Sequence, residues 1–305
     1  MKQTAVWKLV LPFVMLGWAL LYPASKAIVG EVTPIVLSFF RHAVGIIGLL
    51  PFLLWERGGS PVRLTLRDVF FMSVLSLLGV TGFSTFLFLG IDFSSAVNSS
   101  ILTNTQPIFT IFLAPLFIRE RFSAVGLIGA FVGIGGIVLV VTGGNLEAVR
   151  FGENVFVGNM FLLLGALSLS LYSIFIKQYV QKYGSTVATI ITFCFGTVVL
   201  FVIALLTADL WSIIRGFTLR DVLFILYIGI IGTAVTFQLF NASLRYLDVS
   251  VAVGFKFLIP VFGSLFAILF LGERPVPAVL IGMVIVIAAI IIIQQRKRLL
   301  GKERI

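Results

Sequence analysis

The sequence predicts an all-α integral membrane protein with ten transmembrane helices, and two observations lead to this fold class. Hydrophobic residues make up 60% of the chain and charged residues only 11%, whereas a soluble domain carries about 25% charged residues to cover its surface. The apolar segments are also too long for the core elements of a soluble protein, since about 20 apolar residues span a bilayer. The chain is therefore expected to lie in a lipid bilayer.

Ten apolar segments follow one another along the chain. The predicted helices cover roughly residues 7–29, 34–54, 68–90, 94–117, 123–142, 157–178, 185–207, 221–245, 249–271 and 276–294. The connections between them are short, so the chain has no room for a separate soluble domain.

Lysine and arginine residues are concentrated at alternate ends of these helices. With a cytoplasmic N-terminus, the cytoplasmic segments hold 15 of the 22 basic residues and the external ends hold 5. Because basic segments are retained on the cytoplasmic side, both termini are predicted to be cytoplasmic, in the plasma membrane of a bacterial or archaeal cell. Trp7 and Trp55 then lie at the inner interface and Trp211 at the outer one, where aromatic belts form.

The chain contains an internal repeat. Residues 107–120 read PIFTIFLAPLFIRE and residues 260–273 read PVFGSLFAILFLGE, each with a proline 13 residues before a glutamate. Because each unit has an odd number of helices, its second copy has the opposite orientation in the membrane, as in many secondary transporters. We therefore predict two inverted five-helix repeats, residues 1–146 and 147–305.

These motifs resemble the EamA family of the drug/metabolite transporter superfamily over essentially the whole chain. The residues that carry the resemblance are Leu16-Gly17-Trp18, Pro34, Phe40-Arg41-His42, and the repeated stretch ending in Arg119-Glu120-Arg121 and Gly272-Glu273-Arg274. The resemblance implies a central cavity lined mainly by helices 1–4 and 6–9. It also implies alternating access and movement of amino acids, other metabolites or drugs, commonly outward.

The charged residues inside the predicted helices are basic. All twelve acidic residues lie at helix ends or in loops, which argues against a proton-coupled cation exporter, because such a protein needs an intramembrane carboxylate. Arg41 and Lys256 lie about seven residues inside helices 2 and 9 and are predicted to bind an anionic group of the substrate. The alternative is that they bond carbonyl groups freed by helix breaks, or that Lys256 extends toward the interface.

Several other residues are candidates for substrate binding or for movement. Asn98, in the polar first part of helix 4, and Gln238, in helix 8, are predicted to line the cavity or to hold helices together. Trp18 and Tyr22 would form an aromatic wall, and His42 would either couple transport to protons or pack against a neighbouring helix. The helix-interior prolines Pro107 and Pro260 would be hinges or sources of static curvature.

These residues and the resemblance predict a secondary active transporter for a small metabolite with an anionic group, such as an amino acid or organic acid, working as an exporter. The alternatives are a multidrug or cation exporter of the same fold, and a channel or receptor on this scaffold. An enzyme or metal site is not expected, because His42 and Cys194 are the only histidine and cysteine. No cofactor and no nucleic-acid partner are expected, whereas a coupling ion or proton and a homodimer stay open.

Overall fold

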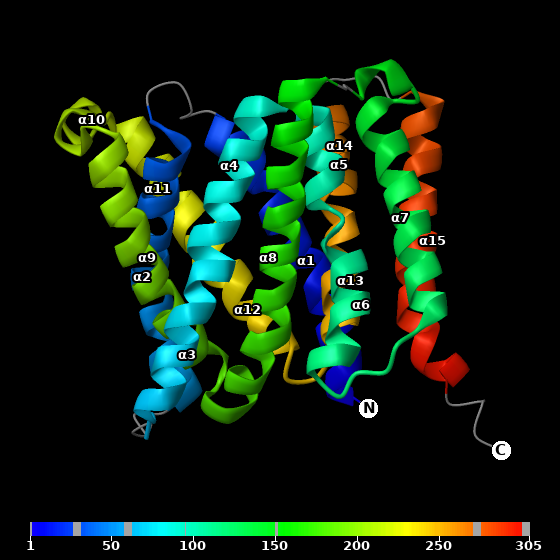
Figure 1. The fold of residues 1–305 in the computed structure, drawn as a ribbon, viewed down its shortest axis with the longest axis horizontal. Helices are drawn as coiled ribbons and strands as arrows, with labels where there is room; N and C mark the ends of the chain where they lie inside the picture. Colours follow the sequence, from blue (N-terminus) through cyan, green and yellow to red (C-terminus); the bar gives the residue numbers. More distant parts are fainter. Residues whose placement is uncertain are drawn as a thin grey trace. The chain divides into compact units, whose positions relative to one another are not determined.

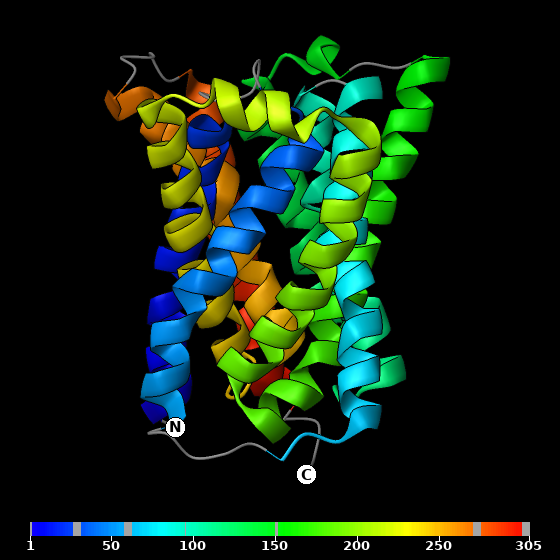
Figure 2. The same cartoon turned by 90° about the vertical axis from the view of Figure 1, so that its left-hand side faces the viewer.

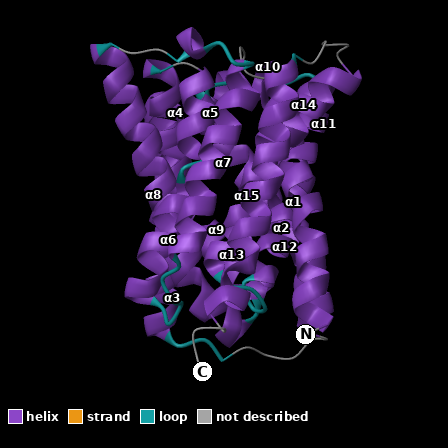
Figure 3. Ribbon diagram, turned by 90° about the vertical axis from the view of Figure 1, so that its right-hand side faces the viewer, coloured by secondary structure: helices purple, strands orange, loops and turns teal. Residues whose placement is uncertain are grey.

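The computed structural model describes residues 2–26, 32–57, 63–94, 96–149, 152–270 and 276–300. Every regular element in this part of the chain is helical (Figure 3). Ten of its helical spans are long and apolar enough to cross a membrane. The predicted all-α fold with ten membrane-spanning helices is therefore confirmed.

The helices follow the predicted order with small shifts at their ends. The first elements are α1 (Lys2–Lys26), α2 (Pro34–Arg57), α3 (Leu66–Ser76), the π-helix η1 (Leu77–Gly82), α4 (Phe83–Phe93), α5 (Ala96–Thr103), α6 (Gln106–Phe117), α7 (Ala124–Thr142) and the 3₁₀-helix η2 (Leu146–Ala148). The later elements are α8 (Glu153–Tyr183), α9 (Ser185–Thr207), α10 (Leu210–Gly216), α11 (Leu219–Gly229), the π-helix η3 (Ile230–Val235), α12 (Thr236–Ser243), α13 (Val249–Gly254), the 3₁₀-helix η4 (Phe255–Phe257), α14 (Leu258–Phe270) and α15 (Pro277–Leu300).

The chain forms two compact units. Unit 1 comprises Met1–Phe88 and Phe175–Tyr246, and unit 2 comprises Leu89–Ile174 and Leu247–Ile305. Each unit takes helices from both halves of the sequence. The predicted repeats, residues 1–146 and 147–305, are repeats of the sequence and do not correspond to these units. The repeats stay a prediction.

In unit 1, α2 packs against α9, α11 and η3, and α1 packs against α12. The start of α2 and the end of α9 contribute to a core of buried apolar side chains, which are Val32, Val36, Leu37, Ala204, Leu210, Ile225 and Ile228. The short helix α10, which the sequence did not predict, lies across the end of α9 (Figure 2). It begins at Asp209, whose carboxylate accepts a hydrogen bond from the Ser212 backbone N–H over 3.1 Å and so caps the helix.

In unit 2, α7 and α15 lie side by side along their length (Figure 1). Glycines make this approach possible, because a Cβ atom at Gly136 would lie 2.9 Å from the Val286 side chain and 3.0 Å from the Gly282 carbonyl oxygen. A Cβ atom at Gly133 would lie 2.4 Å from the ring of Phe257 in η4. Glycines of α7 are thus used for packing within the chain.

Two membrane-spanning helices contain a π-helical segment near their middle, η1 and η3. Their first residues, Leu77 and Ile230, are 153 positions apart, and so are Pro107 and Pro260 of the repeated stretch. π-Helical segments are rare and occur frequently at functional sites. The two copies of the sequence motif and the two π-helical segments are therefore separated by the same number of residues.

The fourth and ninth membrane spans are interrupted. The fourth consists of α5 and α6 with a turn at Asn104 and Thr105, and the ninth consists of α13, η4 and α14. Pro107 and Pro260 were predicted inside continuous helices, but each lies in the first turn of the helix after the interruption. Proline is tolerated at Pro107, the second residue of α6, because the first N–H groups of a helix that follows a turn need no intrahelical acceptor.

Candidate functional site

Lys256 lies in unit 2, in the 3₁₀ segment that interrupts the ninth span. Its side chain is 8% exposed, and its Nζ donates a hydrogen bond over 2.8 Å to Oε1 of Gln106. Gln106 is the first residue of α6 and is 1% exposed. The two helix interruptions thus bring together a buried cation and a neutral amide, an arrangement that we call the Lys256 site.

Hydrogen bonds to α8 hold the Lys256 site in place. Gln106 Nε2 donates over 3.2 Å to Oγ of Ser173, which itself donates over 2.8 Å to the Leu169 carbonyl oxygen. One turn further along α6, the hydroxyl groups of Thr110 and Ser170 lie 2.8 Å apart. Because both ends of the Gln106 amide are engaged, its oxygen is fixed toward Lys256. An amide oxygen stabilises an ammonium group by hydrogen bonding but does not neutralise its charge.

Asn98, the other predicted site residue in unit 2, connects two helices. Its Nδ2 donates over 3.2 Å to Oδ1 of Asn159 on α8, and the Ser94 hydroxyl donates to the same oxygen over 2.7 Å. These bonds correspond to the helix-to-helix alternative that the sequence left open. Contact between Asn98 and a substrate stays a prediction.

Four of the predicted residues lie on α1 and α2 in unit 1. Trp18 is 8% exposed and packs against Phe237 and Phe240, with ring centroids 5.4 and 5.3 Å away. The His42 ring bonds the Ser38 carbonyl oxygen through Nδ1 and packs edge-on against a phenylalanine of α9. Arg41 precedes it on α2 and is half-buried, and the side chain of Tyr22 lies outside the described part of the structure. Their contact with a substrate stays a prediction.

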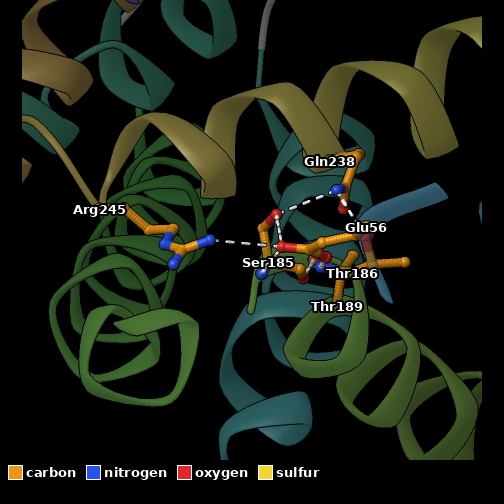
Figure 4. Close-up of polar contacts among 6 residues, drawn as sticks. All are labelled: Glu56, Ser185, Thr186, Thr189, Gln238 and Arg245. Atoms are coloured by element: carbon orange, nitrogen blue, oxygen red, sulfur yellow. Dashed lines mark hydrogen bonds and ion pairs between the residues drawn. The ribbon is translucent and has the colours of Figure 1, made fainter. Parts of the chain in front are cut away.

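Gln238 belongs to a group of polar residues that the sequence did not identify as a group. Figure 4 shows its members, which we call the Glu56 cluster: Glu56, Ser185, Thr186, Thr189, Gln238 and Arg245. The Glu56 carboxylate, at the end of α2, accepts hydrogen bonds from the backbone N–H groups of Ser185 over 3.2 Å and Thr186 over 3.0 Å. A carboxylate suits this place because the first N–H groups of a helix carry partial positive charge.

The remaining contacts of the Glu56 cluster come from α12 and its C-terminal end. Gln238 Nε2 donates to the hydroxyl groups of Ser185 over 2.9 Å and Thr186 over 2.6 Å. Arg245 Nη1 lies 3.5 Å from Glu56 Oε1. The cluster could have been expected in part, because Glu56 and Arg245 fall at helix ends that the basic-residue bias assigns to one side of the membrane.

A second carboxylate has the same local role in unit 2. Glu120, which follows α6, accepts hydrogen bonds from the backbone N–H groups of Val249 over 2.5 Å and Ser250 over 3.4 Å, at the start of α13. Its Oε2 also accepts from the Ser250 hydroxyl over 3.0 Å. Glu120 is part of the repeated motif, but nothing in the motif indicates this contact.

Among the residues that the structure describes, no group of three or more His, Cys, Asp or Glu side chains is arranged to hold a metal ion. Cys194 is partly buried on α9 and is a free thiol. The polar sites in the described part of the chain thus include a buried ammonium–amide pair, an amide pair between helices and two carboxylates at helix starts.

The model of the EamA-like transporter family matches residues 6–142 and 156–294, which together make up nearly the whole chain. The chain belongs to the EamA-like transporter family. It is a multi-pass membrane transporter with ten apolar helices. The resemblance seen in the sequence motifs is confirmed.

Similar proteins are also transporters by name. Proteins named uncharacterized transporters from Archaeoglobus fulgidus and Clostridium kluyveri are 27% and 26% identical, over 92% and 86% of this chain and 95% and 84% of theirs. A protein of Streptantibioticus cattleyicolor named a probable terminal-alkyne amino-acid exporter is 27% identical over 98% of this chain and 96% of its own. A solved structure with 17% identity covers 95% of this chain and 97% of that chain with a TM-score of 0.80, so it has the same fold.

Proposed function

We propose that this transporter moves a small metabolite with an anionic group, such as an amino acid or an organic acid, by alternating access between two inverted five-helix repeats. The observation that carries the proposal is the buried ammonium group of Lys256, which donates to the neutral amide oxygen of Gln106. An ammonium group inside a membrane costs about 3 kcal/mol or more. An anionic cargo beside Lys256 would offset this cost.

Two further observations support an anionic rather than a cationic cargo. The twelve acidic residues fall at the ends of the predicted helices or between them in the sequence, so none is placed deep in a predicted helix where a cationic drug would need a carboxylate. The amino-acid exporter of Streptantibioticus cattleyicolor is similar over nearly the whole chain. This likeness also supports the outward direction of transport.

The experiment is flux into proteoliposomes with a panel of acidic, zwitterionic and cationic solutes. We expect saturable flux of acids or amino acids by the parent protein and loss of that flux in Lys256→Met. Lys182→Met is the matched control, because the Lys182 side chain is 56% exposed and pairs with Asp68. Exposed ion pairs contribute about 0–1 kcal/mol, so this control should transport normally.

The outcomes separate the alternatives. Flux of cations alone, unchanged in Lys256→Met, would contradict the anionic cargo and favour a cation exporter of the same fold. Non-saturable flux without counterflow would favour a channel, and binding without flux a receptor.

A further inference from the structure

Unit 1 contains a pocket of about 360 Å³ where the end of α2 meets the start of α9. We call it the aromatic pocket. Its lining includes Trp7, Trp55, Glu56, Gln238, Arg245 and Tyr246. Small-molecule sites in proteins have volumes of about 300–1,000 Å³. The pocket is formed by unit 1 alone, so it is distinct from the Lys256 site in unit 2.

The aromatic pocket presents one negative and one positive side chain as neighbours. Glu56 is fixed by the N–H groups at the start of α9, whereas Arg245 approaches it only at 3.5 Å. Charge-assisted hydrogen bonds are normally about 2.7–2.9 Å long, so this ion pair is loose. The Arg245 side chain is 41% exposed, and its planar guanidinium can bind a carboxylate through two N–H groups.

Aromatic rings form the apolar part of the pocket. The rings of Trp7 and Tyr246 are stacked, with centroids 5.9 Å apart and an interplanar angle of 12°. Trp55 is 85% exposed. These rings offer an apolar surface beside the two charges, which suits a ligand with an apolar side chain and a charged head group.

Gln238 provides an independent sign that a ligand group is accommodated here. It is 5% exposed, and none of the described residues donates a hydrogen bond to its Oε1. Buried amide oxygens are nearly always hydrogen-bonded in native proteins. A ligand ammonium group beside Gln238 would supply the donor.

We infer that the aromatic pocket binds the zwitterionic head group of an amino acid with an apolar side chain. The α-carboxylate binds Arg245, and the α-ammonium binds Glu56 and Gln238. The ammonium and carboxylate groups of an amino acid are attached to the same α-carbon, so they match two opposite charges that are neighbours in the pocket. The ligand replaces the loose Glu56–Arg245 contact with two complementary ones.

Ligands with a single charge fit the pocket less well. A cation meets Glu56 but is repelled by Arg245, and an anion or a lipid phosphate meets Arg245 but is repelled by Glu56. The inference rests on the proposed function for the class of cargo, but it assigns a second binding site on another part of the chain.

The test is equilibrium binding in nanodiscs to the purified full-length protein carrying Lys256→Met, so that the Lys256 site does not contribute, by calorimetry and by the change in tryptophan fluorescence. The probes are leucine, methionine and threonine as zwitterions, N-acetyl-leucine as an anion and leucinamide as a cation. We expect at least one zwitterion to bind, its two single-charge analogues to bind about tenfold more weakly or worse, and Arg245→Gln to weaken zwitterion binding by about tenfold or more. Leucine should bind more tightly than threonine because of the aromatic walls.

Two controls separate this site from the proposed transport mechanism. Arg215→Gln changes an exposed arginine on α10 and should leave binding unchanged. Lys256→Met should abolish flux but keep binding at the aromatic pocket. Glu56→Gln, which removes the charge that faces the ligand ammonium group, should also weaken zwitterion binding. If this variant fails to fold because the start of α9 loses its carboxylate, Arg245→Lys is used in its place. Arg245→Lys keeps the charge but not the planar fork, so it should bind with intermediate affinity.

Three outcomes would overturn the inference. They are absence of binding for all three zwitterions, equal binding of leucine and one of its single-charge analogues, and unchanged zwitterion affinity in Arg245→Gln. Binding that follows the content of anionic phospholipid in the nanodisc, and not the added amino acid, would assign the pocket to a lipid head group instead.

Discussion

Replacing Glu120 with alanine should destabilise the protein, because this carboxylate satisfies the start of α13. Glu120 accepts from the N–H groups of Val249 and Ser250 and from the Ser250 hydroxyl, and both of those residues are fully buried. Loss of a helix cap costs about 0.5–2 kcal/mol, and a buried N–H group left without an acceptor costs about 1–3 kcal/mol. We therefore expect Glu120→Ala to lower the free energy of unfolding by about 2–4 kcal/mol, and Glu120→Gln, which keeps one acceptor, by about half as much.

The assay is thermal unfolding in detergent followed by circular dichroism. At about 2–4 °C per kcal/mol, Glu120→Ala should lower Tm by about 5 °C or more. Glu147→Ala is the matched control, because Glu147 is exposed in η2, and it should leave Tm unchanged. A Tm for Glu120→Ala within about 1 °C of the parent, or an equal decrease in the control, would show that this carboxylate does not stabilise the start of α13.

The remaining predictions concern packing, the Lys256 site and sidedness. Gly136→Leu should lower Tm, since its Cβ would lie 2.9 Å from the Val286 side chain. Gly135→Leu is the control and should keep Tm, because nothing lies within 4 Å of a Cβ there. Equal Tm values for the two variants would contradict the packing of α7 on α15. Gln106→Glu should have the Tm of the parent protein but should abolish flux of anionic solutes in proteoliposomes, because a carboxylate would neutralise Lys256. Normal anion flux in this variant would contradict the proposed site. A cysteine at Leu64 in a Cys194→Ala background should react with a membrane-impermeant maleimide only from the cytoplasmic side. Labelling of this cysteine in intact cells would contradict the predicted topology.

Helix positions were largely predictable from the sequence because membrane-spanning helices need long apolar segments. The seventh predicted helix, residues 185–207, coincides with α9. The interruption between α5 and α6 was not predicted, since an apolar segment can be continuous in sequence while its backbone turns. The polar stretch from Thr103 to Gln106 marks the interruption in retrospect.

The residues of the candidate sites were predictable by type but not by partner. Lys256 was identified because a charge inside an apolar segment needs a polar environment, but Gln106 lies 150 positions earlier in the chain. Glu56 and Arg245 are likewise far apart in sequence. Such contacts depend on helix packing, on which hydropathy and local motifs carry no information.

In the proposed mechanism, Lys256 holds an anionic cargo during alternating access. Counterflow tests it most directly: proteoliposomes are preloaded with an unlabelled acid or amino acid that the parent transports, and uptake of a trace of the labelled solute is followed. We expect transient accumulation of label for the parent protein and for Lys182→Met, and none for Lys256→Met. Equal accumulation in Lys256→Met would contradict the claim.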